Sequence, residues 1–212
     1  MNLVLFDIDY TILKGVKVHG DAFDYAFKKV YGADISHKAI NCQGMVDTEI
    51  IYKVLRLAGL NDSEIKLRFE ECVSVICEYY DKNKYNEHLI VLPGVKELFK
   101  ALKGKVIIGL LTGNIEHIAH GKLMLLGIDD FIQIGGYGLD SDNRTGVAKA
   151  ALKKAKNIAD IESVFVFGDT PKDIIAGHSI GAKAIAVMTG KYGKNELKHA
   201  DYILKDLTDT KK

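Results

Sequence analysis

Residues 2–12 read NLVLFDIDYTI, an apolar run that ends at two carboxylates with one residue between them. A continuous hydrophobic segment such as residues 3–6 is typical of a strand buried on both faces of a parallel sheet. Alternate residues of an extended chain point the same way, so Asp7 and Asp9 can share one side. Two like charges held close together are costly without a cation between them, and carboxylate oxygens suit Mg²⁺. The stretch therefore predicts either a metal site at a strand end or an ordinary Asp-rich turn.

From residue 93 onward, short apolar strands alternate with amphipathic helices. The predicted strands are 106–111, 131–134, 164–167 and 184–187, with a short edge strand at 202–204, and the predicted helices are 95–102, 115–126, 147–155 and 171–180. This alternation predicts a parallel sheet with helices on both faces. We therefore expect an α/β fold with a Rossmann-like core that combines residues 1–15 with residues 93–212.

Residues 16–92 follow a different pattern, because apolar side chains recur there at helical spacing. The predicted helices are 22–30, ended by Gly32, then 47–57, and a third that is capped within 61–63 and continues through Tyr80. We expect no buried strand between residues 16 and 88. This segment is predicted to be an α-helical cap domain inserted between the first strand and the rest of the core.

Composition narrows the classes of function. The chain has 212 residues, 48% of them hydrophobic, which is ample for a packed core. The net charge of +1 comes without a basic block, so we expect neither a nucleic-acid partner nor a membrane surface. No apolar run approaches the roughly 20 residues that span a bilayer, and the N-terminus lacks the pattern of a signal peptide. Three cysteines without metal-site spacing predict reduced thiols in a cytoplasmic protein.

Polar side chains follow each predicted strand at the edge where ligands bind in such folds. Beyond Asp7 and Asp9, the segments that supply them are Thr112-Gly113-Asn114, then a loop with Asp140, Asp142 and Arg144, then Gly168-Asp169-Thr170 with Asp173. Most of them have a structural explanation when taken alone: Thr112 or Asn114 can cap a helix, and Arg144 can be a solvated surface residue. Helix capping accounts for Asp173 but leaves Asp169 unexplained. The convergence of these residues on one edge predicts an active site.

Other common sites are absent from the sequence. The seven histidines include no HExxH pair, so a zinc site is not expected. No GxxxxGK[ST] loop is present, and Gly136-Tyr137-Gly138 does not complete GxGxxG because Ser141 stands at the third glycine position. Nucleotide binding of either type is therefore not supported.

Together these motifs resemble those of the haloacid dehalogenase superfamily of hydrolases, in the phosphoglycolate phosphatase-like group with a helical cap. The family pattern DxDx[TV] is matched by residues 7–11, an apolar strand ending in Ser or Thr by Thr112, and GDxxxD by residues 168–173. The remaining motif is a Lys or Arg, for which Arg144 is the best match and Lys149 the competing cation. Tyr10 departs from the pattern, since Gly is common there, and Arg144-Thr145 stands where Lys-Pro is frequent.

The resemblance implies a role for each matching residue. Asp7 would be the nucleophile that becomes an aspartyl phosphate, and Asp9 the general acid and base. The expected Mg²⁺ ligands are the Asp7 side chain, the Asp9 backbone carbonyl and Asp169, supported by Asp173 and Thr11. The expected phosphate-binding residues are Thr112, Gly113, Asn114 and Arg144. The cap would close over the site on hinges at 14–20 and 89–93.

The resemblance also orders the possible activities. A Mg²⁺-dependent phosphatase acting on a small phosphate ester such as phosphoglycolate is the first expectation. A phosphosugar mutase of the β-phosphoglucomutase type keeps both aspartates and stays open, as does a non-catalytic interaction protein. A dehalogenase or phosphonatase is disfavoured, because neither needs Asp9. The protein is expected to be a monomer or a homodimer.

Overall fold

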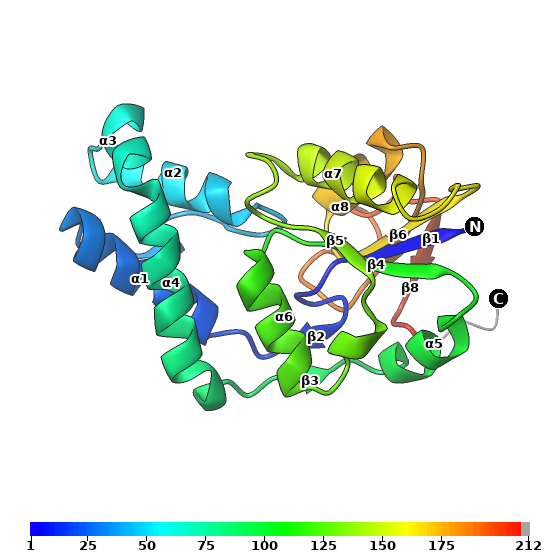
Figure 1. Cartoon of the computed structure of the whole chain (residues 1–212). Coiled ribbons are helices and arrows are strands. Elements are labelled where there is room, and N and C mark those ends of the chain that lie inside the picture. Colours follow the sequence, from blue (N-terminus) through cyan, green and yellow to red (C-terminus); the bar gives the residue numbers. More distant parts are fainter. Residues whose placement is uncertain (209–212) are drawn as a thin grey trace.

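The computed structural model describes residues 1–208, and its core is a six-stranded parallel sheet (Figure 1). In spatial order the strands are β5 (Ile134–Gly136), β4 (Ile107–Leu111), β1 (Leu3–Phe6), β6 (Val164–Gly168), β7 (Lys183–Val187) and β8 (Tyr202–Leu204). Every neighbouring pair runs parallel, and β1 lies between β4 and β6. The predicted parallel sheet and its edge strand at 202–204 are confirmed. Residues 209–212, at the end of the predicted core range, lie outside the described residues.

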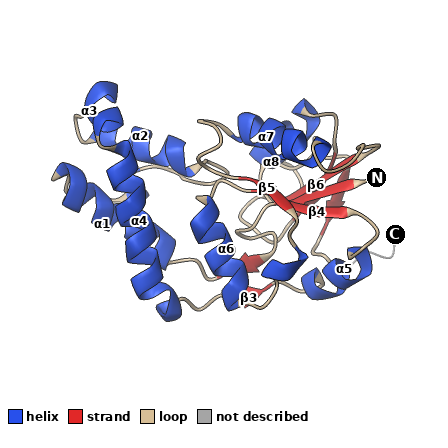
Figure 2. Cartoon of the chain, viewed as in Figure 1, coloured by secondary structure: helices blue, strands red, loops and turns tan. Residues whose placement is uncertain are grey.

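Helices cover both faces of this sheet, as Figure 2 shows. They are α5 (Val95–Leu102), α6 (Glu116–Leu125), α7 (Arg144–Lys156) and α8 (Pro171–Ser179). The alternation of side chains along β1 explains the layering. Val4 and Phe6 pack in one cluster with residues of α5 and α6, whereas Leu3 and Leu5 pack in another with residues of α7 and α8. A strand that is apolar at every position is therefore buried on both sides.

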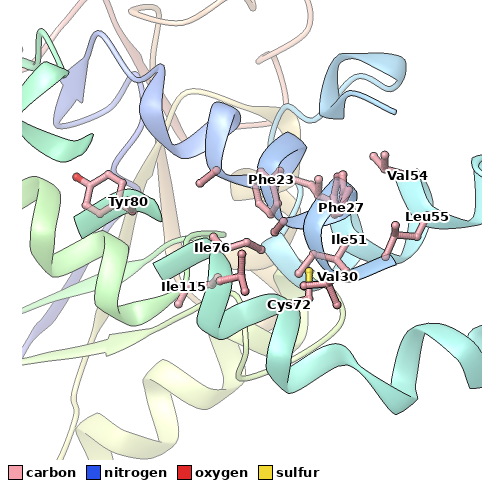
Figure 3. Close-up of a cluster of buried hydrophobic side chains, with 14 of the residues drawn as sticks. Phe23, Phe27, Val30, Ile51, Val54, Leu55, Cys72, Ile76, Tyr80 and Ile115 are labelled. Atoms are coloured by element: carbon pink, nitrogen blue, oxygen red, sulfur yellow. The ribbon is translucent and has the colours of Figure 1, made fainter. Parts of the chain in front are cut away.

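The segment between β1 and α5 forms the helical cap, seen on the left of Figure 1. Its helices are α1 (Val18–Tyr31), α2 (Asp47–Leu57), α3 (Asp62–Leu67) and α4 (Phe69–Asn83). Their buried faces make one hydrophobic cluster that includes Phe27, Ile51 and Ile76 (Figure 3). Ile115 and Ile118 of the sheet-containing part belong to the same cluster, so the cap packs against the start of α6. The predicted helical insertion is confirmed.

One predicted cap helix is wrong, because the helix expected to run through Tyr80 is two helices. α3 begins with the capping box of Asn61 and Glu64, as the sequence indicates, but it ends at Leu67. Arg68 follows with φ −119° and ψ 16°, and α4 begins at the next residue. The Arg68 guanidinium donates to the backbone carbonyl of Val30 on α1 and to the Glu71 carboxylate. Contacts with a distant helix, which local periodicity does not encode, accompany this break.

The predicted strand 131–134 is also displaced. Residues 129–131 form a short 3₁₀ turn, and β5 begins at Ile134. Gln133 hydrogen-bonds to both backbone groups of Ile108 through its own N–H and its side-chain oxygen, at 2.9 and 3.0 Å. The strand then continues through two glycines, and a Cβ on Gly136 would lie 2.3 Å from the Val147 carbonyl oxygen of α7. Glycine has a low strand propensity, but at Gly136 it allows α7 to pack closely against the strand.

Two short strands connect the cap to the sheet-containing part. β2 (Leu13–Lys14) pairs antiparallel with β3 (Ile90–Val91), which places the entry to the insertion beside its exit. Gly15 follows β2 with φ +96°, and a Cβ there would lie 2.2 Å from the His88 carbonyl oxygen. The two segments predicted as hinges therefore lie side by side. Within residues 1–208, no helix combines the length and the apolar character needed to cross a membrane.

Candidate active site

A cavity of about 840 Å³ lies between the cap and the carboxyl ends of the strands. Its sheet-side wall includes Asp7, Asp9, Tyr10, Gly113, Asn114, Arg144 and Asp169. Its cap-side wall includes His19, Phe23, Asp47 and every residue of the connection from His37 to Met45. The predicted convergence of strand ends therefore occurs, and the helical insertion forms the opposite wall of the cavity.

Three buried carboxylates gather on one side of this cavity. Asp7 follows β1, whereas Asp169 and Asp173 follow β6, and one oxygen from each lies within 4.8 Å of the others. The Arg144 guanidinium pairs with both Asp7 and Asp173, and its Nε donates to Asp173 Oδ1 at 2.9 Å. One guanidinium thus faces three carboxylates that are almost entirely shielded from solvent.

The electrostatics of this cluster favour an added cation. Burial, together with the neighbouring carboxylates, raises the pKa of Asp7 to about 7 although Arg144 opposes the rise. Burial, followed by the charges of Asp7 and Asp173, raises the pKa of Asp169 to about 9. A divalent cation would offset this repulsion, and an all-oxygen donor set suits a hard ion such as Mg²⁺. The residues present therefore fit a metal bound between Asp7 and Asp169.

Asp173 has a supporting position. Its Oδ2 accepts hydrogen bonds from the backbone N–H and the hydroxyl of Thr170, at 3.1 and 2.7 Å, which completes the capping box of α8. Pro171 occupies the first position of that helix, as the sequence predicts. A Cβ on Gly168 would lie 2.3 Å from the Asp173 Cβ, so the glycine of GDxxxD lets the helix start approach the strand.

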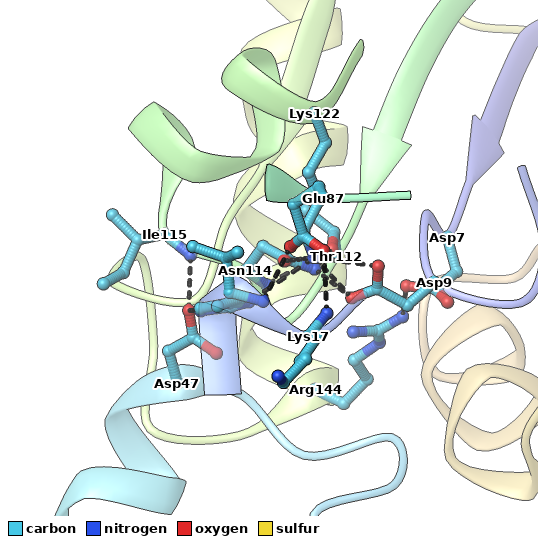
Figure 4. A network of polar contacts seen from close by, with 12 residues as sticks. Asp7, Asp9, Lys17, Asp47, Glu87, Thr112, Asn114, Ile115, Lys122 and Arg144 are labelled. Carbon is cyan, nitrogen blue, oxygen red and sulfur yellow. Dashed lines mark hydrogen bonds and ion pairs between the residues drawn. The ribbon is translucent and has the colours of Figure 1, made fainter. Parts of the chain in front are cut away.

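Asp9 lies in a different environment from Asp7. The Lys122 ammonium on α6 lies 2.8 Å from Asp9 Oδ1 and 3.0 Å from Oδ2 (Figure 4). Asn114 donates from Nδ2 to Asp9 Oδ2 at 3.0 Å. Burial is the largest influence and tends to raise the pKa of Asp9, but the charge and hydrogen bonds of Lys122, the hydrogen bond of Asn114 and the charge of His19 together lower that pKa. Asp9 is therefore held as a carboxylate with one edge toward the cavity.

The Thr112-Gly113-Asn114 segment does not cap the helix after it. α6 begins at Glu116, its N-cap residue Ile115 makes no side-chain cap, and the Ile115 N–H donates instead to Asp47 of the cap at 2.7 Å. The Asn114 side chain bridges Asp9, Lys122 and the Thr112 hydroxyl. Thr112 is fully buried and is not part of the cavity wall, whereas Gly113 and Asn114 are.

Arg144 is the first residue of α7, so this helix begins three residues before the predicted start at residue 147. Asn143 caps this helix by accepting from the Gly146 N–H at 2.9 Å. Arg144 is 6% exposed and contacts Asp7, whereas Lys149 is exposed on the same helix. Arg144, and not Lys149, therefore contacts the carboxylate cluster.

Tyr10 and Thr11 complete the loop after β1. Tyr10 has φ +63°, the left-handed conformation that favours glycine, so this backbone explains why glycine suits the position. The Thr189 hydroxyl donates to the Tyr10 carbonyl, and the Tyr10 side chain lies on the cavity wall. Thr11 is buried, and its hydroxyl has no hydrogen-bond partner among the described residues.

Cap residues enter the same polar network. His19 on α1 is buried, with Nε2 2.9 Å from Asp47 Oδ2 in poor hydrogen-bond alignment and Nδ1 3.4 Å from the Lys122 ammonium. The Asp47 N–H donates to the Gly113 carbonyl at 2.8 Å. A Cβ on Gly113 would lie 2.1 Å from the Met45 carbonyl oxygen, so this glycine permits the approach of the cap.

Sequence reasoning missed Lys122 and His19. Lys122 follows Ile118 and Ala119 and precedes Leu123, all of them buried. A lysine inside the apolar stripe of a helix that follows a strand end is the signal that identifies it. His19 has no comparable signal, because an isolated histidine before an amphipathic helix is common.

Comparison with known proteins places this geometry in a family. The family model described as haloacid dehalogenase-like hydrolase matches residues 4–187. No curated protein sequence matches the chain.

Solved structures share the fold at low sequence identity. CbbY from Rhodobacter sphaeroides in complex with phosphate is 17% identical, with a TM-score of 0.77 over 98% of this chain and 95% of that one. A predicted phosphoglycolate phosphatase from Haemophilus somnus is 20% identical, with a TM-score of 0.71 over 98% and 95%. A β-phosphoglucomutase from Clostridium difficile is 18% identical, with a TM-score of 0.70 over 99% and 92%. Because the family model covers most of the sequence, the chain belongs to the haloacid dehalogenase-like hydrolases.

Proposed function

We propose that the chain is a Mg²⁺-dependent phosphatase that hydrolyses a small phosphomonoester through an aspartyl phosphate on Asp7. One observation carries the proposal: Asp7 faces a single cavity together with a carboxylate cluster suited to a metal on one side and Asp9 on the other. A phosphatase of this type needs a nucleophile, a cation to offset the charge of the phosphate, and a group that moves protons. Each of them has a candidate at this cavity.

In the first step the Asp7 oxygen attacks phosphorus and the bond to the ester oxygen breaks. Asp9, whose resting form is a carboxylate, takes up a proton from solvent before this step and gives it to the departing alcohol. In the second step water attacks the same phosphorus, Asp9 takes the water proton, and free Asp7 and inorganic phosphate are released. Arg144, at the N-terminus of α7, orients Asp7 through their ion pair. When bound, Mg²⁺ would be held by Asp7 and Asp169 and would supply positive charge against the anionic phosphate.

The cap supports selection of a small substrate. Residues 16–92 would act as the domain that closes over the core of residues 1–15 and 93–212, with the paired strands β2 and β3 at its base. The described cap contributes His19, Asp47 and the 37–45 connection to the cavity wall. A phosphoglycolate-like ester is the first candidate, and the likeness to the Haemophilus somnus protein is in keeping with it.

A panel of phosphate esters tests the proposal. Purified protein should release inorganic phosphate from at least one small monoester with Mg²⁺ and lose that activity with a chelator. The panel should include 2-phosphoglycolate, sugar phosphates and p-nitrophenyl phosphate. Isomerised sugar phosphate with little free phosphate would identify a mutase instead, and no turnover of any ester would refute the proposal.

A further inference from the structure

The buried ammonium of Lys122 is a feature that the mechanism above does not use. Its side chain is fully buried, and the charge has three kinds of partner: both oxygens of Asp9, the Asn114 side-chain oxygen at 2.6 Å, and His19 Nδ1 at 3.4 Å. A buried charge is tolerated only when it is paired and hydrogen-bonded. The Lys122 ammonium is therefore held in place by a defined set of polar side chains.

Stability alone is a weak reason for this arrangement. Replacing a buried ion pair by well-packed apolar residues is often neutral or stabilising. The helix positions around Lys122 are already apolar, since Ile118, Ala119 and Leu123 are buried. A methionine or leucine at residue 122 would continue the same stripe. The ion pair with Asp9 is therefore better explained by what it does to Asp9.

The geometry restricts how Asp9 can rotate. Lys122 contacts both carboxylate oxygens, and Asn114 holds Oδ2 from a second direction. Asn114 is itself fixed by Lys122 and by the Thr112 hydroxyl, to which it donates at 2.7 Å. The Asp9 side chain remains 27% exposed toward the cavity, whereas that of Lys122 is not exposed at all. Figure 4 shows the Asp9 carboxylate beside Asn114 and Lys122, and its exposed part belongs to the cavity wall.

We propose that Lys122 is a positioning residue that aims Asp9 at the water attacking the phosphorylated Asp7. This inference rests on the proposed phosphatase function. In that step an O–P bond from water forms, the O–P bond to Asp7 breaks, and the water proton passes to the free edge of Asp9. Lys122 touches neither substrate nor water, and it acts through the orientation of the Asp9 carboxylate.

The choice of probe separates this step from the first one. p-Nitrophenyl phosphate has a weakly basic leaving group that departs with little proton donation, so phosphorylation of Asp7 depends little on Asp9. The value of kcat/KM depends on the steps up to phosphorylation of Asp7. The value of kcat equals the rate of aspartyl phosphate hydrolysis when that hydrolysis is the slow step. Lys122→Met should lower kcat by about 10²-fold, in the range of general acid–base effects, and change kcat/KM by less than about 3-fold. Rapid mixing should then show a burst of nitrophenol, and acid quenching should trap phosphorylated protein.

Two comparisons make the role of Asp9 explicit. Lys154→Met is the matched control, because Lys154 is a helix lysine paired with Asp140 at 2.8 Å outside this cavity, and it should leave both constants unchanged. The double variant Lys122→Met, Asp9→Asn should be no slower than Asp9→Asn alone, because a residue that acts through Asp9 loses its effect without it. Additive losses would contradict the proposal.

The outcomes separate the two hypotheses. If the wild-type protein turns over p-nitrophenyl phosphate or another aryl phosphate with a weakly basic leaving group, but Lys122→Met lowers kcat and kcat/KM equally or not at all, only the role of Lys122 is refuted. If the wild-type protein hydrolyses nothing, the proposed function fails and this inference fails with it. Lys122→Gln serves as a second variant, and failure of both variants to fold would assign Lys122 to the stability of the core and overturn the proposal.

Discussion

Asp7 and Asp9 are two residues apart and line one cavity, yet they lie in opposite electrostatic surroundings. Asp7 belongs to a carboxylate-rich side, where burial and neighbouring negative charge raise its pKa to about 7. Asp9 belongs to a cation-rich side, where Lys122, with help from Asn114 and His19, lowers the pKa against the effect of burial. The pattern DxD alone contains no sign of this difference. The residues that separate the two environments come from distant elements, Asp169 from the end of β6 and Lys122 from α6.

The difference matches the division of labour that the proposed mechanism needs. The Asp7 side can accept a metal that offsets the charge of a nucleophile approaching a phosphate. The Asp9 side keeps a carboxylate anchored without a metal, because Lys122 and Asn114 already supply donors. Two carboxylates of the same type thereby acquire separate roles from their surroundings.

The largest expected effect comes from exchanging the two aspartates one at a time for the isosteric amide. Asp7→Asn should abolish phosphoenzyme formation and reduce turnover by about 10⁴-fold or more, because the nucleophile is lost. Asp9→Asn should still form phosphoenzyme with p-nitrophenyl phosphate but should hydrolyse it slowly. Acid-quench trapping of phosphoprotein measures the contrast. Equal trapping in both variants would show that Asp7 is not the phosphorylated residue.

Much of the fold follows from the sequence because it depends on local pattern. The apolar run of β1 and the helical spacing of α2 give the observed bounds at Leu3–Phe6 and Asp47–Leu57. The break at Arg68 is accompanied by a contact with α1, and the glycine that ends β5 lies against α7. No window of neighbouring residues contains that information.

The candidate site divides in a similar way. Asp7, Asp169 and Arg144 could be placed together from sequence, because carboxyl ends of parallel strands share one edge. Lys122 is harder to place, because a lysine on a helix usually extends into solvent, and its position inside an apolar stripe is the one sequence signal that it is buried. The role of Asn114 was obscured by a common alternative, since Asn before a helix is an ordinary cap. The catalytic roles of these residues stay predictions.

A smaller effect should come from changing Gly190, which lies against Asp169, one of the two proposed metal ligands. A Cβ on Gly190 would lie 1.8 Å from Asp169 Oδ2 and 2.7 Å from its Cγ, so Gly190→Ala must displace that carboxylate. We expect the concentration of Mg²⁺ needed for half-maximal activity to rise by about 10- to 100-fold, as for changes that disturb ligand orientation. Mg²⁺ titration of activity measures this.

Gly193→Ala provides the matched control for that experiment. A Cβ there would meet only Glu196 Oε2, at 3.4 Å, on an exposed loop. The Mg²⁺ requirement of this variant should equal that of the wild-type protein. If Gly190→Ala also left it unchanged, Asp169 would not be a metal ligand.

The last prediction concerns how the stabilisation of the fold by Mg²⁺ changes with pH. We expect this change to come from Asp7 and Asp169 and not from Asp9. Folding raises the pKa of Asp7 to about 7 and that of Asp169 to about 9, from an ordinary value of 3.8. Between these values the folded protein binds more protons than the unfolded chain, so metal-free stability falls as pH rises.

Mg²⁺ replaces those protons, and its stabilising effect should therefore grow with pH. The difference in Tm between Mg²⁺ and chelator should be larger at pH 9 than at pH 6 by at least a few degrees, since about 1 kcal/mol already shifts the Tm of a domain of this size by about 2–4 °C. Because the difference is taken at each pH, histidine titration that is common to both conditions cancels. Asp169→Asn removes one of the two groups and should flatten the dependence. A difference in Tm that stays constant across this range would mean that the carboxylates of Asp7 and Asp169 are ionised without a metal.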